Sequence, residues 1–241
     1  MIKKIHKKTR EAHEFIKNSK IGLIVFSEII LGMLAVIGSI VVLVKIREEV
    51  FENDLNIFDN NILHFLYSIR TPFLNEIMIF ITNLGGDFVV ILGILIIAYL
   101  FIKNHNRAAL IMGLVLIMSG ILDTVLKDIV KRPRPQFHPL VTETGYSFPS
   151  GHAMNSFVFY AVLSYLVFYF TKSKKLAIIF AIVSMLLVLL IGISRVYLGV
   201  HYPSDVIAGY IAGFSWFMSL VLVERTLKFF KLFQEHAEVR K

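Results

Sequence analysis

The sequence contains no cysteine. Disulfide bonds, thiolate nucleophiles, and zinc or iron–sulfur centres with cysteine ligands are therefore excluded. Internal repeats, low-complexity runs and Pro/Gly-rich linkers are also missing, so nothing in the sequence marks a boundary between domains. Acidic residues are few, because 17 Asp and Glu stand against 25 Lys and Arg, and the formal net charge is +8.

Apolar residues, in contrast, make up 56% of the 241 residues. A soluble domain of this size cannot bury so many in one core, which indicates a membrane protein. In such a protein an excess of Lys and Arg is typical of cytoplasmic loops, so the positive charge does not predict nucleic-acid binding. The first apolar run is about as long as a full span and no small-residue cleavage site follows it, which predicts an anchor rather than a signal peptide.

Six apolar stretches are long enough to cross a hydrocarbon core of about 30 Å. They cover residues 21–44, 88–102, 108–126, 153–170, 176–193 and 206–223, and the second is short unless it begins near Ile81. Between the first two, apolar residues from Phe58 to Ile69 recur at helical spacing, which predicts an amphipathic helix at the interface or one packed on the bundle. We therefore predict an all-α bundle of six transmembrane helices with an interfacial amphipathic helix between the first two spans.

The distribution of Lys and Arg beside the spans predicts the orientation in a cell membrane. Positive charges cluster in residues 1–20, in the loops near 103–107 and 172–175, and in residues 225–241. If six spans alternate, these segments share one side, so we expect cytoplasmic segments at 1–20 and 225–241 around one multi-pass domain at 21–224. The loops at 46–85, 127–152 and 194–205 are then extracytoplasmic.

The loop after the third span conflicts with this orientation, because it carries Lys127, Lys131, Arg132 and Arg134 on the disfavoured side. Arg and Lys suit phosphate, so an anion site would explain the cluster, and an ordinary solvated or headgroup-binding loop explains it equally well. Asp123 stands four residues before Lys127 and is placed either to steady its ammonium or to form a simple helix-end pair.

Two further segments carry polar groups on the same side. In 148–152, Ser150 can cap the next helix, Gly151 allows close approach to the backbone, and His152 follows at the same edge. In 194–205, His201 and Asp205 stand four residues apart where the last span begins, so the carboxylate can orient the ring. Alone, a bystander histidine and a capping aspartate explain each segment. Convergence of all three segments on one face favours a functional site.

The three segments resemble the three-part signature of the type 2 phosphatidic acid phosphatase superfamily over about 127–205. The residues that carry the resemblance are Lys127, Arg134, Pro135, Pro149, Ser150, Gly151, His152, Ser194, Arg195, His201 and Asp205. The resemblance implies that His201 is the nucleophile, that Asp205 orients it and that His152 protonates the leaving oxygen. It also implies a phosphate site formed by Lys127, Arg134, Ser150, Gly151 and Arg195, with no metal and no cofactor.

The expected function is a lipid phosphatase with its site at the extracytoplasmic edge. It would remove the terminal phosphate of phosphatidylglycerophosphate or undecaprenyl diphosphate, with phosphatidic acid a further candidate, through a phosphohistidine. The expected partners are the lipid and inorganic phosphate, without nucleic acid, and the sequence is silent on the oligomeric state. A phosphotransferase between lipids and a non-catalytic lipid or anion transporter are the alternatives. Glu28, a charge inside the first span, is expected to have a structural role.

Overall fold

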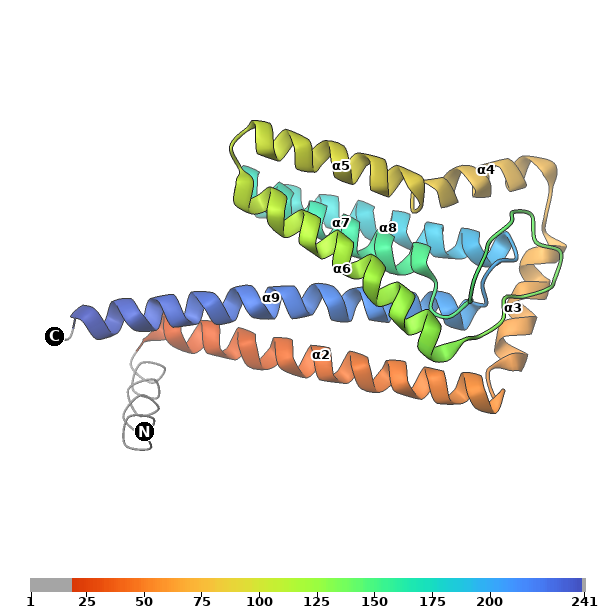
Figure 1. Cartoon of the computed structure of the whole chain (residues 1–241), viewed down its shortest axis with the longest axis horizontal. Coiled ribbons are helices and arrows are strands. Elements are labelled where there is room, and N and C mark those ends of the chain that lie inside the picture. The colour runs from red at the N-terminus through yellow and green to blue at the C-terminus, as the bar shows by residue number, and fades with distance from the viewer. Residues whose placement is uncertain (1–18, 240–241) are drawn as a thin grey trace. The chain divides into compact units, whose positions relative to one another are not determined.

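The computed structural model describes residues 19–239 (Figure 1). Over these residues the chain forms eight α-helices and no strand. They are α2 (Lys20–Glu52), α3 (Asn56–Ser68), α4 (Pro72–Asn83), α5 (Asp87–Ile102), α6 (Asn106–Val130), α7 (Gly151–Thr171), α8 (Lys174–Tyr197) and α9 (Pro203–Val239). Most of the basic N-terminal segment, up to residue 18, lies outside the described residues, as do Arg240 and Lys241. The all-α prediction is confirmed.

Within residues 19–239, six stretches of helix are long and apolar enough to cross a membrane. They are Lys20–Glu52, Pro72–Ile102, Asn106–Val130, Gly151–Thr171, Lys174–Tyr197 and Pro203–Glu235. Each contains one of the six apolar stretches predicted from the sequence, so the count of six spans is confirmed.

The second span is longer than expected, because residues 46–85 do not form a loop. They contain the end of α2, the whole of α3 and the whole of α4. Helix α4 starts at Pro72 because Thr71 accepts a hydrogen bond from the Leu74 amide at 3.2 Å. A turn at 84–86, which contains two consecutive glycines, separates α4 from α5. Gly86 holds the N-cap position of α5 without a side-chain bond, and Asp87 lies in the first turn.

The described chain divides into two compact units, residues 39–214 and residues 19–38 with 215–239. In the larger unit α7 is the most buried helix, and side chains such as Met154, Val158 and Phe159 are fully enclosed. On α5, α6 and α8, in contrast, many large apolar side chains are exposed, including Ile94 and Ile117. An apolar surface of that extent is stable against hydrocarbon and not against water, so these helices turn their outer faces to lipid.

Helix α3 has one buried and one exposed face. Its apolar residues Ile62 and Leu66 pack against a cluster of α7, α8 and α9 residues, Ala153, Val196 and Val206. On its outer face, Ile57 and Phe65 are exposed. Helix α3 therefore packs on the bundle and also presents apolar side chains outward, as an amphipathic helix does.

The smaller unit contains Glu28, the charge inside the first span. Its carboxylate forms an ion pair with Arg225, with 3.3 Å between Oε2 and Nε. Phe26 and Phe229 pack with ring centroids 6.2 Å apart in the same unit. The arginine provides the partner that a carboxylate in an apolar span needs, which agrees with the structural role expected for Glu28.

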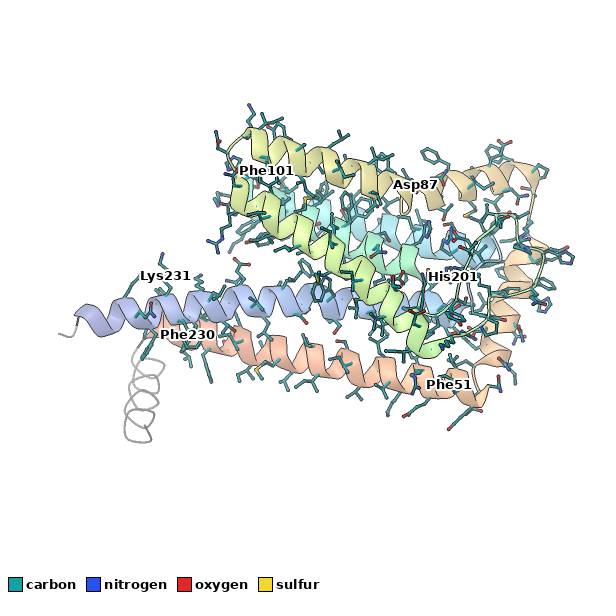
Figure 2. All side chains as sticks on the ribbon, in the orientation of Figure 1. Phe51, Asp87, Phe101, His201, Phe230 and Lys231 are labelled. Atoms are coloured by element: carbon teal, nitrogen blue, oxygen red, sulfur yellow. The ribbon has the colours of Figure 1, made fainter. Side chains whose placement is uncertain are left out.

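In the larger unit, the polar loops gather at one end (Figure 1). The segment 131–150, the connection between α8 and α9, and helix α3 lie together there, whereas the α5–α6 turn lies at the opposite end. Figure 2 shows His201 at the first end and Phe101 at the second. The three segments that carry the predicted site residues are therefore adjacent in space.

Candidate active site

Local sequence places each part of the site at the end of a helix. Helix α6 ends at Val130 because Lys131 adopts a left-handed conformation, and the extended segment that follows carries Arg132 and Arg134. The Ser150 hydroxyl accepts a bond from the Ala153 amide at 3.5 Å and so caps α7, which starts at Gly151. The backbone amide of Ser150 donates to the Asp205 carbonyl at 2.9 Å, which ties the start of α7 to the start of α9.

His201 is buried, with 2% of its side chain exposed, between Asp205 and Arg134. Its Nε2 lies 3.2 Å from Arg134 Nη1, and because a guanidinium group can only donate, this ring nitrogen must accept. The ring proton then belongs to Nδ1, which lies 3.3 Å from Ser147 Oγ and 3.7 Å from Asp205 Oδ2. Burial lowers the pKa of His201 to about 4, although Asp205 works in the opposite direction. The imidazole is therefore neutral near pH 7, with its lone pair on Nε2.

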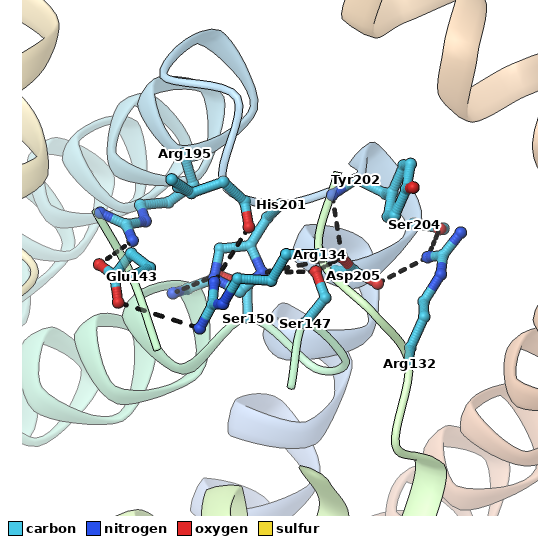
Figure 3. Close-up of polar contacts among 12 residues, drawn as sticks. Arg132, Arg134, Glu143, Ser147, Ser150, Arg195, His201, Tyr202, Ser204 and Asp205 are labelled. Carbon is cyan, nitrogen blue, oxygen red and sulfur yellow. Dashed lines mark hydrogen bonds and ion pairs between the residues drawn. The ribbon is translucent and has the colours of Figure 1, made fainter. Parts of the chain in front are cut away.

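Asp205 is fully buried and every oxygen of its carboxylate is bonded (Figure 3). Arg132 donates to Oδ1 at 2.6 Å. Ser147 Oγ donates to Oδ2 at 2.5 Å, and the Tyr202 amide donates to the same oxygen at 2.9 Å. These bonds hold the carboxylate in one orientation beside the Nδ1 edge of His201.

The cations predicted to hold phosphate converge on the same end of the bundle. Arg195 is almost fully buried and donates to Thr82 Oγ1 of α4 at 2.8 Å. Arg134 is held by bonds to backbone carbonyls, among them that of Val200 at 3.0 Å. Lys127 pairs with Asp123 at 2.8 Å, as the spacing on α6 predicted.

Gly151 lies close to the Lys127–Asp123 pair. A Cβ atom added at Gly151 would lie 2.6 Å from Asp123 Oδ2 and 3.1 Å from Lys127 Nζ. Any side chain at this position would therefore push the pair away from the start of α7. The absence of a side chain lets the ammonium group approach the free amides at the helix N-terminus, where an anion is stabilised.

Glu143 places a carboxylate among these cations. It accepts a hydrogen bond from Arg195, and its other oxygen lies 3.9 Å from Arg134 Nη2 (Figure 3). Burial alone would raise the pKa of Glu143, but the charge of Arg195 and its hydrogen bond outweigh burial and lower the pKa. A cavity of about 240 Å³ adjoins Glu143 and Arg134, and its other lining residues include 139–142 and Val200. The cations thus already surround an anionic group of the chain itself.

His152 lies at the second position of α7, against the turn between α4 and α5. A Cβ atom added at Gly86 would lie only 2.8 Å from His152 Nε2. Arg195, Glu143 and His201 all lie close enough to this imidazole to interact with it electrostatically. All eight residues predicted for the site therefore belong to one neighbourhood.

Four residues of this neighbourhood were missed as site residues. Arg132 was grouped with the phosphate-binding cations, yet it points to the carboxylates of Asp59 and Asp205. Asp59 itself had a sequence signal, because it precedes Ile62 and Leu66 by three and seven residues and so lies on the apolar face of α3. Ser147 and Glu143 lie in an irregular loop, where no periodicity predicts which side chain points inward.

Known proteins resemble the chain in sequence and structure. The model of the PAP2 superfamily matches residues 108–228. Phosphatidylglycerophosphatase B of Bacillus subtilis (strain 168) is 40% identical over 168 residues, which are 68% of this chain and 81% of that protein. An undecaprenyl-diphosphatase of Sulfolobus acidocaldarius is 34% identical over 164 residues, 64% of this chain and 72% of that protein.

A solved structure agrees with these relatives. The crystal structure of a transmembrane PAP2-type phosphatidylglycerolphosphate phosphatase from Bacillus subtilis matches with a TM-score of 0.75 and 33% identity. The match covers 81% of this chain and 97% of that one. The chain therefore belongs to the PAP2 superfamily, as one of its membrane lipid phosphatases.

Proposed function

We propose that the protein hydrolyses the terminal phosphate of phosphatidylglycerophosphate or undecaprenyl diphosphate at the extracytoplasmic face, through a phosphohistidine on His201. The names of the two relatives support these lipids, and phosphatidic acid, like phosphatidylglycerophosphate, ends in a phosphate monoester. The observation that carries the proposal is the neutral His201 ring, whose Nε2 lone pair faces Arg134 next to a cluster of cations that already holds a carboxylate.

The geometry supports a reaction in two steps. In the first, Nε2 of His201 forms a bond to phosphorus, the bond from phosphorus to the leaving oxygen breaks, and His152 gives that oxygen a proton. Asp205 stabilises the positive charge that the ring then carries. In the second, water attacks phosphorus and gives a proton to His152, the bond from phosphorus to Nε2 breaks, inorganic phosphate leaves and His201 becomes neutral again.

The cations of the site supply the charge that these steps need. Lys127, Arg134 and Arg195, with Ser150 and the Gly151 amide, would bind the equatorial oxygens of phosphate, where charge develops in the transition state. A phosphate dianion would displace Glu143 from Arg195 and Arg134. Because the cations lie on the chain itself, the proposed reaction needs no metal, and turnover is expected to continue in a strong chelator.

The position of the site favours a lipid substrate. Lys127 is in the last turn of α6, and His152 lies in the first turn of α7, so the reacting groups lie at the ends of spans. At that depth the headgroup of a lipid reaches the cations while its tails stay beside the exposed apolar faces of the helices.

The test is release of inorganic phosphate by purified protein in detergent, with phosphatidylglycerophosphate, undecaprenyl diphosphate, phosphatidic acid and a soluble phosphoester compared. His201→Ala is expected to lower turnover by at least about a thousandfold, because the nucleophile is lost. His105→Ala is the matched control, since His105 is exposed at the far end of the unit. Normal turnover by His201→Ala would remove the proposed nucleophile, and phosphate recovered on a second lipid instead of in water would indicate a transferase.

A further inference from the structure

A buried ion-pair network lies behind Asp205, on the side away from His201. Asp59 of α3 is fully buried, and its Oδ2 lies 2.7 Å from Arg132 Nη2. The other terminal nitrogen of Arg132 lies 2.6 Å from Asp205 Oδ1. One guanidinium group therefore bridges two buried carboxylates that are far apart in the sequence.

Ser204 and Tyr202 complete the network. The Ser204 amide donates to Asp59 Oδ1 at 2.9 Å, and its hydroxyl donates to Asp59 Oδ2 at 2.6 Å. The guanidinium group of Arg132 lies over the ring of Tyr202, 4.0 Å from its centroid. Figure 3 shows Arg132 on the far side of Asp205 from Arg134 and Arg195. Arg132 is thus fixed on several sides and is turned away from the phosphate-binding cations.

The net charge of this network affects how well a positive charge on the His201 ring is stabilised. Arg132 alone would neutralise Asp205, which would weaken the attraction between that carboxylate and a positively charged His201 ring. Asp59 supplies a second negative charge that offsets Arg132, so the two carboxylates and one guanidinium together carry one net negative charge. His201 is also faced by Arg134 from the loop after α6 and by Arg195 from α8, both positive. The net negative charge of the network therefore lies next to the His201 ring, which becomes cationic during the proposed reaction.

We propose that Asp59 and Arg132 are a positioning pair, which orients Asp205 and preserves its negative charge for the phosphorylated or protonated state of His201. This inference rests on the proposed function. Desolvation makes buried ion pairs weak contributors to stability, so folding alone is a poor reason for one here. Asp59 lies outside residues 108–228, so the match to the family model does not include α3. Helix α3 thereby contributes to catalysis without touching phosphate.

The test compares Asp59→Asn with the wild-type protein. Asparagine keeps the shape and an acceptor for the Ser204 amide but removes the charge. The kcat for lipid phosphate release is expected to fall about tenfold to a hundredfold, whereas KM and the vanadate inhibition constant change less than about threefold, because the pair does not contact phosphate. Asp54→Asn makes the same chemical change at an exposed position before α3 and is expected to have no effect.

A double-mutant cycle separates positioning from a general structural effect. In an Asp205→Asn background, which is expected to retain residual turnover from His201 and the cations, Asp59→Asn should have little further effect if it acts through Asp205. Equal losses in both backgrounds, or an unchanged kcat in the single variant, would overturn the inference.

Two controls keep the result interpretable. If Asp59→Asn no longer binds vanadate, Ser204→Ala replaces it, since that change leaves every charge in place and removes only the hydroxyl that donates to Asp59 and accepts from Arg132, and the same non-additivity with Asp205→Asn is expected. Failure of the proposed function is recognised separately, because wild-type protein would then release no phosphate or His201→Ala would be fully active. An active, His201-dependent enzyme that is indifferent to Asp59 and Ser204 refutes only the positioning pair.

Discussion

Glu143 provides the counter-charge for two arginines that phosphate is proposed to bind. Arg195 is 2% exposed and Arg134 is 14% exposed, so neither is well solvated when the carboxylate leaves. On the proposed function, a phosphate or vanadate ion would have to displace that carboxylate before it could bind both arginines. The affinity measured for any anion would then include the free energy of removing Glu143.

Glu143→Gln is expected to strengthen anion binding, because the glutamine is neutral and leaves both arginines with unpaired positive charge. The vanadate concentration that halves phosphate release should fall about threefold or more, which corresponds to about 0.7 kcal/mol. Glu76→Gln, at an exposed position of α4, is the control and should leave that concentration unchanged. Weaker inhibition in Glu143→Gln would show that the carboxylate assists binding instead of competing.

His201 should make the stability of the protein depend on pH. Its pKa is about 4 in the folded protein and about 6.5 in an unfolded chain, so the unfolded state binds more protons between these values. The contribution of His201 to the free energy of unfolding is therefore fully present above about pH 6.5 and is lost as the pH falls toward 4.

The measurement is the thermal unfolding temperature in detergent at about pH 7.5 and pH 4.5, for wild-type protein and His201→Gln. Glutamine does not titrate, so the wild-type protein should lose more stability on acidification than the variant does. His105→Gln, with the change at an exposed residue, should behave like the wild type. Equal losses in wild-type protein and His201→Gln would mean that burial does not hold the ring neutral.

Among the elements, the break between α4 and α5 has a direct bearing on the site. The turn at 84–86 brings Thr82 to Arg195 and brings Gly86 to the imidazole of His152. A Cβ atom at Gly86 would lie 2.8 Å from His152 Nε2, and one at Gly85 would clash with the side chain of Ile191. The two glycines therefore shape one wall of the site as well as ending α4.

Gly86→Ala is expected to displace His152, because the new Cβ would lie 2.8 Å from Nε2 and real carbon atoms do not approach so closely. Since a shift of about 1 Å in a catalytic group can cost on the order of a hundredfold, kcat should fall at least about tenfold, most for substrates with poor leaving groups. Gly120→Ala on α6 is the control, because a Cβ there meets nothing within 4 Å. Wild-type turnover by Gly86→Ala would show that His152 can move without consequence.

For the whole molecule, the arrangement of charge gives the cations on the disfavoured side a role in the fold of the site. Three cations lie at the site end, and each is paired with a carboxylate. Lys127 pairs with Asp123, and Arg134 pairs with Glu143. Arg132 pairs with both Asp59 and Asp205. Lys131 is exposed at the same end, so three of the four cations of this loop serve the site itself. The loops near 103–107 and 172–175 then favour an orientation with the site end outside.

Because the natural chain has no cysteine, single cysteines can report this orientation without background labelling. Asp54→Cys lies at the site end before α3, and Lys174→Cys lies at the start of α8, and both positions are exposed. A membrane-impermeant maleimide added to intact cells should label Asp54→Cys and should label Lys174→Cys only after lysis. The reverse pattern would place the site in the cytoplasm.

Much of the fold and site could be predicted from the sequence, for reasons that are local. Apolar runs of about 20 residues determine spans, so all six were found. The cap at Ser150, the Asp123–Lys127 pair and the His201–Asp205 spacing depend on residues within one turn of helix. The break between α4 and α5 lies at a pair of glycines, which favour a turn because they lack a side chain.

Only the tertiary structure decided what lies around that local framework. The Asp59–Arg132 pair joins residues 73 apart in the sequence, and the contact between Arg195 and Glu143 joins residues 52 apart. Pairings at that separation follow from how helices pack and from which buried charges must find partners, and no periodicity encodes either. The sequence by itself determined the spans and the residue types of the three motifs, whereas packing determined which carboxylates neutralise the cations, since a buried charge takes whichever partner the fold brings within reach.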